Sequence, residues 1–337
     1  MHAMTLHAQA PIASHPLIPE RREPTTPSAH ELLVRVAACG VCRTDLHVIE
    51  GDLPLHRVPI VPGHQIVGRV ERLGEGVTRF RAGDRVGIAW LRKTCGRCRF
   101  CRSGRENLCP HAEFTGWDTD GGFADHAVVD ERFAYAIPPV FGDAEAAPLL
   151  CAGIIGYRAL KLSGVMGPGR LGIYGFGSSA HVTLQIARAR GADVYVCTRE
   201  ATHRDLARQL GAVWVGDIRQ PMPQRMDGTI IFAPAGDLVP VALASLDKGG
   251  TLALAGIYMT SLPPLDYPAL FDERIIRTVT ANTRGDGEEL LEAAAAIPIR
   301  PAVTTFPLAE ANHALERLKS GALVGSGVLV TGGASGL

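Results

Sequence analysis

The chain has 337 residues, of which 46% are hydrophobic and 20% charged, and Lys plus Arg equal Asp plus Glu at 34 each. Such a length and composition are typical of a globular protein with two domains. The balanced charge excludes a strong field that would attract nucleic acid or an anionic membrane surface.

Targeting and membrane signals are the next features to exclude. No stretch approaches the roughly 18 apolar residues of a membrane span, and residues 1–9 show no apolar run after a basic start. Eight cysteines in a chain without a visible secretion signal favour metal ligation over disulfides. We therefore expect a cytoplasmic protein that binds neither nucleic acid nor membrane.

The first motif that carries chemistry is Cys42-Arg43-Thr44-Asp45-Leu46-His47, which follows a run of strand formers at 31–38. A thiolate can hold zinc, while a hydroxyl and an imidazole can pass on a proton. The spacing of Cys39 and Cys42 leaves a pair of zinc ligands or a redox pair open. Because the polar hexapeptide begins at Cys42, we interpret Cys39 as a buried strand residue.

A second candidate ligand is His64, which follows the turn signal Pro62-Gly63 and precedes a predicted strand at Ile66–Leu73. A single histidine in this setting is more often an ordinary core or surface residue. The glycine turns that follow, up to Val86, predict short strands and a small β-rich domain.

Four cysteines spaced x2, x2 and x7 give the strongest single signal, and they predict a structural zinc closed by four thiolates. Two disulfides or an iron–sulfur cluster are the alternatives, but two-residue loops strain disulfides and the spacing differs from that of ferredoxins. His111 is interpreted as a bystander, and Trp90 and Trp117 flank this segment. The four cysteines are Cys95, Cys98, Cys101 and Cys109.

A dinucleotide-binding turn is predicted at Gly175-Phe176-Gly177-Ser178-Ser179-Ala180, between a short strand and a helix that runs through Arg190. Its glycines let the backbone approach a pyrophosphate, whose charge the helix N-terminus stabilises. Cys151, in an apolar run before this region, is the third candidate ligand of the active site.

The end of the second strand, Val194–Cys197, bears on the choice of coenzyme. NAD-binding proteins usually place an acid there for the ribose hydroxyls, whereas this chain continues with Thr198 and Arg199. A hydroxyl beside a guanidinium favours a 2′-phosphate, so we expect NADP(H) rather than NAD(H). Glu200 keeps the alternative open, because a shift of one residue restores an acid.

The remaining alternation of strands and helices predicts a parallel, doubly wound sheet. Helices are predicted at Asp286–Ile297 and Leu308–Ser320, followed by a strand at Gly327–Thr331, and these last segments are expected to return to the first domain. The other predicted helices are His203–Leu210 and Leu238–Leu246, and the other strands are Leu171–Tyr174, Val213–Val215, Thr229–Phe232, Thr251–Ala255 and Thr278–Ala281.

In their order along the chain these motifs resemble the medium-chain, zinc-dependent alcohol dehydrogenase family. The resemblance covers nearly the whole chain and implies an α/β protein with a GroES-like β-rich catalytic domain and a Rossmann doubly wound parallel-sheet cofactor domain. The implied domains are residues 1–152, with the structural-zinc lobe at about 91–112, then 153–284 for the cofactor and 285–337 for the return.

The resemblance also implies two zinc ions per chain and a set of roles. Cys42, His64 and Cys151 would hold the catalytic zinc, with the fourth position left for water or a substrate oxygen. Thr44 and His47 would relay the proton with the coenzyme ribose between them. Zinc would lower the pKa of the alcohol, hydride would pass to the nicotinamide, and the same site would reduce aldehydes.

Asp45 would hold the histidine ligand in its orientation, as an acid beside that histidine does in the family. The implied partners are small alcohols, primary and aliphatic or aromatic, and the matching aldehydes and ketones. A homodimer or homotetramer is the implied assembly.

Three positions depart from the family pattern. Gln65 stands where a glutamate often follows the zinc-binding histidine, and Thr198 replaces the usual acid. The segment 325–327 lacks an arginine that many members place against the coenzyme phosphates, for which Arg199 and Arg284 are the candidate replacements.

Two other functions remain as alternatives. Polyol or sugar dehydrogenases of the same fold commonly lack the four-cysteine lobe and use a glutamate ligand, so the lobe and Cys151 argue against them. A non-catalytic zinc or cofactor-binding protein would not need the complete set of ligands and relay residues that this chain has.

Overall fold

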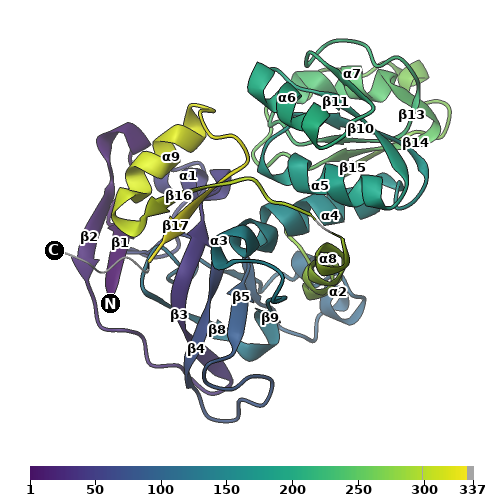
Figure 1. Ribbon diagram of the computed structural model, residues 1–337. Helices are drawn as coiled ribbons and strands as arrows, with labels where there is room; N and C mark the ends of the chain where they lie inside the picture. The colour runs from purple at the N-terminus through teal and green to yellow at the C-terminus, as the bar shows by residue number, and fades with distance from the viewer. Residues whose placement is uncertain (298, 332–337) are drawn as a thin grey trace. The chain divides into compact units, whose positions relative to one another are not determined.

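The computed structural model describes residues 1–297 and 299–331, and the chain divides into two compact units (Figure 1). Unit 1 holds Met1–Cys151, Ala281–Ala295 and the described residues from Pro301 onward, and unit 2 holds Ala152–Thr280 with the short stretch after Ala295. The chain thus passes between the units after Cys151 and again after Thr280, where the sequence placed boundaries after 152 and after 284.

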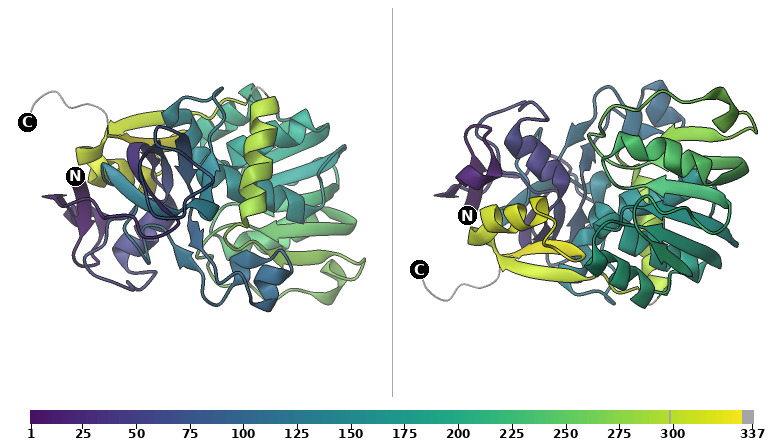
Figure 2. Two further views of the ribbon diagram at one scale, coloured as in Figure 1. Left: turned by 90° about the horizontal axis from the view of Figure 1, so that it is seen from below. Right: turned by 90° about the horizontal axis from the view of Figure 1, so that it is seen from above.

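Unit 1 is built on a mixed sheet in the order β16-β17-β3-β4-β5-β9, with β8 also paired to β3. The long strand β3 (Glu31–Gly40) lies antiparallel to β4 (Gln65–Leu73), and its mostly buried residues contribute to an apolar core. From the C-terminal segment, β17 (Ser326–Val330) pairs with β3, so the end of the chain contributes a strand to the main sheet of unit 1. Figures 1 and 2 show the yellow C-terminal strands beside the purple N-terminal ones.

The other strands of unit 1 include two short pairs, β1 with β2 and β6 with β7, that stand outside the main sheet. The remaining elements of unit 1 are β1 (His2–Leu6), β2 (Leu17–Arg21), β5 (Arg85–Ile88), β6 (Leu91–Lys93), β7 (Glu113–Phe114), β8 (His126–Asp130), β9 (Ala134–Ala136), β16 (Val303–Pro307), α1 (Arg43–Glu50), α2 (Arg99–Arg102), α3 (Asp143–Ala146), α8 (Arg284–Ala296), α9 (Ala311–Lys319), and the 3-10 turns η1 (Ile12–Ser14), η2 (Glu106–Leu108), η3 (Glu131–Phe133), η4 (Ala147–Leu150) and η7 (Leu308–Glu310).

Unit 2 contains a six-stranded sheet in the order β12-β11-β10-β13-β14-β15, and every pairing in it is parallel. This order reverses between β10 and β13, and such a switch point is where doubly wound sheets bind ligands. The elements are β10 (Gly169–Tyr174), β11 (Ala192–Cys197), β12 (Trp214–Gly216), β13 (Met226–Ile231), β14 (Leu246–Leu254), β15 (Ile275–Thr278), α4 (Ala152–Ser163), α5 (Ser178–Ala189), α6 (Ala201–Gln209), α7 (Val239–Ala244), η5 (Gly236–Leu238) and η6 (Tyr267–Ala269).

Four elements predicted from the sequence need correction. The helix expected to reach Leu246 ends at Ala244, and strand β14 begins at Leu246 and continues through Gly249 and Gly250. Gly249 has a φ of 70°, and the pairing with β13 shifts register nearby, so these glycines form an irregularity inside the strand rather than its boundary. The last strand of the sheet is Ile275–Thr278 rather than Thr278–Ala281, and the helix expected from Leu308 starts with the 3-10 turn η7.

The described residues also bear on membrane insertion. Within the ranges 1–297 and 299–331, no helix combines the length and the apolar character needed to cross a bilayer.

Candidate active site

The hexapeptide from Cys42 to His47 opens helix α1, which the sequence did not predict. Cys42 is the N-cap residue in extended conformation, and its backbone N–H donates to Asp45 Oδ2 at 2.9 Å. This is the acidic half of a capping box, with cysteine in place of the usual serine or threonine. Thr44 and His47 are three residues apart on the helix, so their side chains lie on one face.

Asp45 connects the helix to the second candidate ligand. Its Oδ1 lies 2.9 Å from Nδ1 of His64 and also accepts the backbone N–H of Gly63 at 3.2 Å. The aspartate is 2% exposed and the histidine fully buried. Burial raises the pKa of the Asp45 carboxyl, and the neighbouring His64 opposes that shift. A carboxylate on Nδ1 fixes the ring orientation and leaves Nε2 for another ligand.

Nε2 of His64 lies 3.2 Å from Sγ of Cys151, and the donor atoms of Cys42, His64 and Cys151 all lie within 4.8 Å of one another. A hydrogen bond from Cys151 lowers the pKa of Cys42 well below its ordinary value, and that same shared proton raises the pKa of Cys151. Two thiols and one imidazole at this separation are the donor set of a zinc site with one open position. The residues present therefore fit a catalytic zinc.

The protonation of His64 would change when a metal binds. Burial alone would lower the pKa of His64, but the charge and hydrogen bond of Asp45 raise it to about 10. A ligand nitrogen must be free of its proton, so metal binding at this cluster releases protons.

Cys151 reaches the cluster from the end of the 3-10 turn η4. Pro148 lies within this turn, and Cys151 follows it with a φ of −137° and a ψ of −69°, which ends the turn before helix α4. The turn packs against strands β4 and β5. The position of Cys151 is therefore set by the same sheet that carries His64.

Of the two residues of the proposed proton relay, Thr44 lies beside the cluster and His47 follows it on helix α1. Thr44 is 7% exposed, and its Oγ1 lies 3.7 Å from Sγ of Cys42. Nδ1 of His47 lies 2.7 Å from Oδ2 of Asp52, a residue that the sequence reading missed. Gly51, with a φ of 100°, ends helix α1 and turns the chain so that Asp52 comes back to the histidine. A glycine followed by an acid just after the helix was the available signal.

Gln65 and Trp90 are neighbours of His64: Gln65 follows it at the start of strand β4, and Trp90 contacts its ring. Gln65 is 2% exposed and lies opposite Gly40 in the β3–β4 register, where a Cβ on Gly40 would come within 2.9 Å of the amide carbon of Gln65. Trp90 meets the ring of His64 edge-on, with centroids 4.9 Å apart. Cys39, predicted to be a buried strand residue, is fully buried in β3 and lies outside the three-residue cluster.

The four-cysteine lobe forms a second cluster, whose sulfur atoms lie within 4.8 Å of one another. Backbone N–H groups point at these sulfurs, as from Cys98 to Cys95 and from Cys101 to Cys98, at 3.4 and 3.5 Å. Backbone hydrogen bonds lower the pKa of Cys95 to about 6, whereas burial raises that of Cys101 to about 11. All eight cysteines are free thiols, and four thiols in this arrangement fit a closed tetrahedral zinc.

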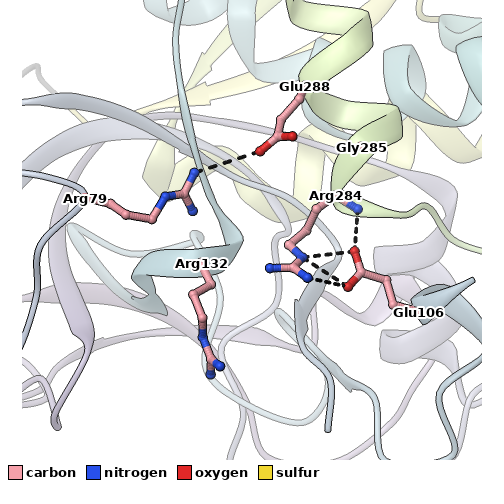
Figure 3. Close-up of a pocket in the computed structure, with 6 residues that line it drawn as sticks. All are labelled: Arg79, Glu106, Arg132, Arg284, Gly285 and Glu288. Atoms are coloured by element: carbon pink, nitrogen blue, oxygen red, sulfur yellow. Dashed lines mark hydrogen bonds and ion pairs between the residues drawn. The ribbon is translucent and has the colours of Figure 1, made fainter. Parts of the chain in front are cut away.

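Arg284 lies in unit 1, where its guanidinium is already paired with a carboxylate. Its guanidinium forms a fork with both carboxylate oxygens of Glu106, at 2.8 to 3.0 Å, and Glu106 also accepts the backbone N–H of Arg284 (Figure 3). The same guanidinium lies over the ring of Phe133. Glu106 is 7% exposed and belongs to the cysteine lobe, so this pair joins the lobe to the start of helix α8. We therefore do not retain Arg284 as a candidate for the coenzyme phosphates.

The predicted dinucleotide turn connects strand β10 to helix α5 in unit 2. Gly175 has a φ of 85°, and a Cβ there would lie 2.9 Å from the backbone nitrogen of Ala233. Gly177 is the N-cap of α5 and provides no capping side chain, and a Cβ on it would meet only open space. Ser178 and Ser179 form the first turn of the helix, and Ala180 is fully buried. This arrangement suits a pyrophosphate at the helix N-terminus.

A hydroxyl, an arginine and an acid follow the end of strand β11, and a second arginine, on helix α6, contacts their backbone. Thr198 is 1% exposed, while the Arg199 side chain is 81% exposed and its Nε lies 3.0 Å from Oε1 of Glu200. Arg204, which the sequence reading missed, donates from Nη1 to the backbone carbonyls of Thr198 and Arg199 at 2.9 and 2.6 Å. It lies on helix α6 and holds the backbone of Thr198 and Arg199 in place.

Sequence comparisons relate the chain to known proteins. Residues 28–139 match the alcohol dehydrogenase GroES-like domain, and residues 180–296 match the zinc-binding dehydrogenase family. The chain is 49% identical to a probable alcohol dehydrogenase of Mycobacterium tuberculosis over 98% of this chain and 97% of that one. It is 36% identical to an alcohol dehydrogenase of Geobacillus stearothermophilus, covering 89% and 91%.

Solved structures give a similar result. A cinnamyl alcohol dehydrogenase of Sorghum bicolor superposes with a TM-score of 0.90 at 29% identity, over 98% of both chains. A cobalt- and zinc-bound thermostable alcohol dehydrogenase of Pyrobaculum aerophilum has a TM-score of 0.89 at 25% identity, covering 98% of this chain and 99% of that one.

Proposed function

Because the chain belongs to the medium-chain, zinc-dependent alcohol dehydrogenase family, we propose that it interconverts alcohols with aldehydes or ketones at the Cys42–His64–Cys151 cluster. The expected fold class, a GroES-like domain with a Rossmann domain, and the expected enzyme class, an alcohol dehydrogenase, are confirmed by these matches. The proposal for the site rests on one observation: two thiol sulfurs and one imidazole nitrogen lie within 4.8 Å of one another in unit 1.

We propose two zinc ions per chain, one at the three-residue cluster and one in the cysteine lobe. When bound, the first zinc supplies Lewis acidity toward an alcohol or carbonyl oxygen, and a bound nicotinamide accepts or donates the hydride. The side chains supply orientation: Asp45 holds His64 by Nδ1, so that Nε2 faces the metal position. The four-cysteine site is closed by its own ligands, so its role is structural.

Thr44 and His47 are proposed to move the proton. The hydroxyl of Thr44 lies next to the sulfur of Cys42 and so stands where a substrate hydroxyl would deliver its proton. His47 lies on the same face of α1, and Asp52 on its Nδ1 fixes the ring and favours a proton there. With its side chain 15% exposed, His47 can exchange that proton with water.

For the coenzyme we propose NADP(H) in preference to NAD(H). Thr198 and Arg199 stand where an acid would bind the ribose hydroxyls, and Arg204 holds their backbone in place. The Arg199–Glu200 ion pair has to open before the guanidinium can receive a 2′-phosphate. Because Arg199 is largely exposed, this opening costs little.

The assembly is proposed to be a homodimer or homotetramer formed through unit 2. Strand β15 is the terminal strand of its sheet, and Ile275 on it is 51% exposed. The loop before it leaves Tyr258, Tyr267 and Phe271 exposed by 60% to 72%. An apolar patch at a sheet edge is typical of an interface between copies of a chain. We also propose the cytoplasm as its location, because its eight free thiols suit a reducing compartment.

The test is to measure initial rates of NADPH and NADH oxidation with benzaldehyde on zinc-loaded enzyme. We expect reduction of the aldehyde with a higher kcat/KM for NADPH. Faster turnover with NADH would refute the coenzyme proposal, and the absence of turnover with every alcohol and aldehyde tried would refute the proposed activity.

A further inference from the structure

A cavity of about 330 Å³ in unit 1 is lined mainly by charged side chains (Figure 3). Its volume is enough for a small molecule. Three arginines and two glutamates surround it, so a ligand that fits it must be charged or strongly polar. None of its lining residues belongs to either cysteine cluster. The lining residues are Arg79, Glu106, Arg132, Arg284, Gly285 and Glu288.

Arg284 presents one edge of its guanidinium to this cavity. Its Nε and Nη2 form the fork with Glu106, whereas Nη1 has no hydrogen-bond partner within the described part of the chain. The guanidinium carbon also lies 4.8 Å from the ring centroid of Phe133. The fork and the ring hold the cation in one orientation, so Nη1 is preorganised as a donor for an outside group.

Arg79 is the second cation of the cavity, and its acidic partner is held only weakly. Nη1 of Arg79 donates to the backbone carbonyl of Glu131 at 2.7 Å, which fixes the guanidinium from one side. Nη2 lies 3.9 Å from Oε1 of Glu288, too far for a hydrogen bond. The side chains of Arg79 and Glu288 are 41% and 63% exposed, so water screens this pair. An outside anion can therefore replace the Glu288 carboxylate.

The start of helix α8 adds a backbone donor to the same cavity. The N–H of Arg284 donates to Glu106, and that of Asp286 donates to Oγ1 of Thr283. The N–H of Gly285 has no hydrogen-bond partner within residues 1–297 and 299–331. A Cβ on Gly285 would come no closer than 3.8 Å to any neighbour, so this N–H is not covered. The positive end of the helix dipole also favours an anion here.

The positive charges around the cavity act on one another. The fork with Glu106 raises the pKa of Arg284, whereas burial and the charge of Arg132 oppose that rise. Arg132 pairs with Asp130 and points away from Arg79 and Arg284 (Figure 3). An anion in the cavity would reduce the repulsion between these cations, because an opposite charge nearby favours the charged form of each.

We propose that this cavity binds a small phosphate anion, either inorganic phosphate or the phosphate group of a monoester. The phosphate oxygens accept hydrogen bonds from Nη1 of Arg284, from the guanidinium of Arg79 and from the N–H of Gly285, and the Glu288 carboxylate turns out into water. Donors from three separate groups match the three oxygens of a phosphate better than the two of a carboxylate. This site is additional to the proposed dehydrogenase site and does not depend on its activity.

Calorimetric titration of the zinc-loaded protein without coenzyme, at constant ionic strength, tests the site with phosphate, glycerol 3-phosphate and acetate. We expect phosphate to bind with a Kd of about 1 mM or below, and acetate to bind more weakly. Arg79→Gln should raise the phosphate Kd about tenfold or more. Arg81→Gln is the matched control, because Arg81 is also exposed and lies two residues away but does not line the cavity. It should leave the Kd unchanged.

Glu288→Gln gives a readout that a damaged fold cannot imitate, because it should strengthen binding. Loss of the competing carboxylate should lower the phosphate Kd about two- to fivefold. An unchanged Kd in Arg79→Gln would mean that phosphate binds elsewhere, and it would overturn the inference, as would an unchanged Kd in Glu288→Gln or the absence of saturable phosphate binding. With the expected changes in both variants, a lower Kd for glycerol 3-phosphate than for phosphate would identify a monoester as the ligand, and the reverse order would identify inorganic phosphate.

Discussion

Replacing Asp45 by asparagine should weaken metal binding at the three-residue cluster without unfolding the protein. The carboxylate accepts from the backbone of Cys42 at 2.9 Å, from the backbone of Gly63 at 3.2 Å and from Nδ1 of His64 at 2.9 Å. Asparagine has nearly the same shape but only one acceptor atom, and its NH₂ group would face a donor. The ring of His64 would then lose the charge that fixes its orientation.

The size of the effect follows from the role of such outer partners. Removing the partner of a ligating histidine typically costs 10- to 100-fold in metal affinity, or about 1.4 to 2.8 kcal/mol. The affinity can be measured by competition between the enzyme and a chromophoric zinc chelator, after the cysteine lobe has been filled. Asp52→Asn is the control, because Asp52 also pairs with a histidine at 2.7 Å but lies outside both cysteine clusters.

We expect Asp45→Asn to lower the zinc affinity of one site per chain and Asp52→Asn to leave both affinities unchanged. Equal zinc affinities in Asp45→Asn and the wild type would show that the buried carboxylate does not support the ligand, and the reasoning about the site would be wrong.

Three further outcomes are expected. Burial lowers the pKa of His181 to about 4 in the folded protein. As the pH falls, the unfolded chain therefore protonates this histidine before the folded protein does. The contribution of neutral His181 to the unfolding free energy is fully present above about pH 6.5 and is lost as the pH falls toward about 4. At pH 5 this group lowers the unfolding free energy by about 2 kcal/mol. The unfolding free energy of His181→Leu, measured with urea, should therefore depend less steeply on pH than that of the wild type. Equal slopes for the variant and the wild type would contradict this prediction. Glu106→Gln weakens a fork whose glutamate is buried and whose arginine is partly exposed, and it should cost about 1 to 3 kcal/mol of unfolding free energy. Glu288→Gln, at an exposed pair 3.9 Å apart, should change the unfolding free energy by less than about 0.5 kcal/mol, and equal effects of the two substitutions would count against the fork. Arg199→Ala should raise the KM for NADPH about tenfold and leave that for NADH unchanged, and a parallel change in both would remove Arg199 from the phosphate site.

The candidate metal ligands could be proposed from the sequence because few residue types can hold zinc. Cys42, His64 and Cys151 are far apart in the chain, yet the structure brings their donor atoms within 4.8 Å. Regular alternation of apolar strands and helices likewise predicted the parallel sheet of unit 2, because such periodicity is a local property of the chain.

The features that could not be predicted from the sequence depend on contacts between distant residues or on a residue type that is rare at its position. Helix α1 was missed because cysteine is a rare N-cap, and the acid that completes the box was interpreted only as a partner of the histidine. The Glu106–Arg284 fork joins residues 178 positions apart, so no spacing rule could have found it. The stacking of His56 on Trp117 is equally non-local, since a surface histidine has no periodic signature.

The central claim is that Cys42, His64 and Cys151 together hold the zinc at which alcohols react. Measuring the zinc content and benzaldehyde reduction of Cys151→Ala tests it most directly, because this residue alone comes from the end of η4. The account predicts one zinc per chain, a folded protein and loss of turnover by several orders of magnitude. Two zinc ions per chain together with turnover close to that of the wild type would contradict it.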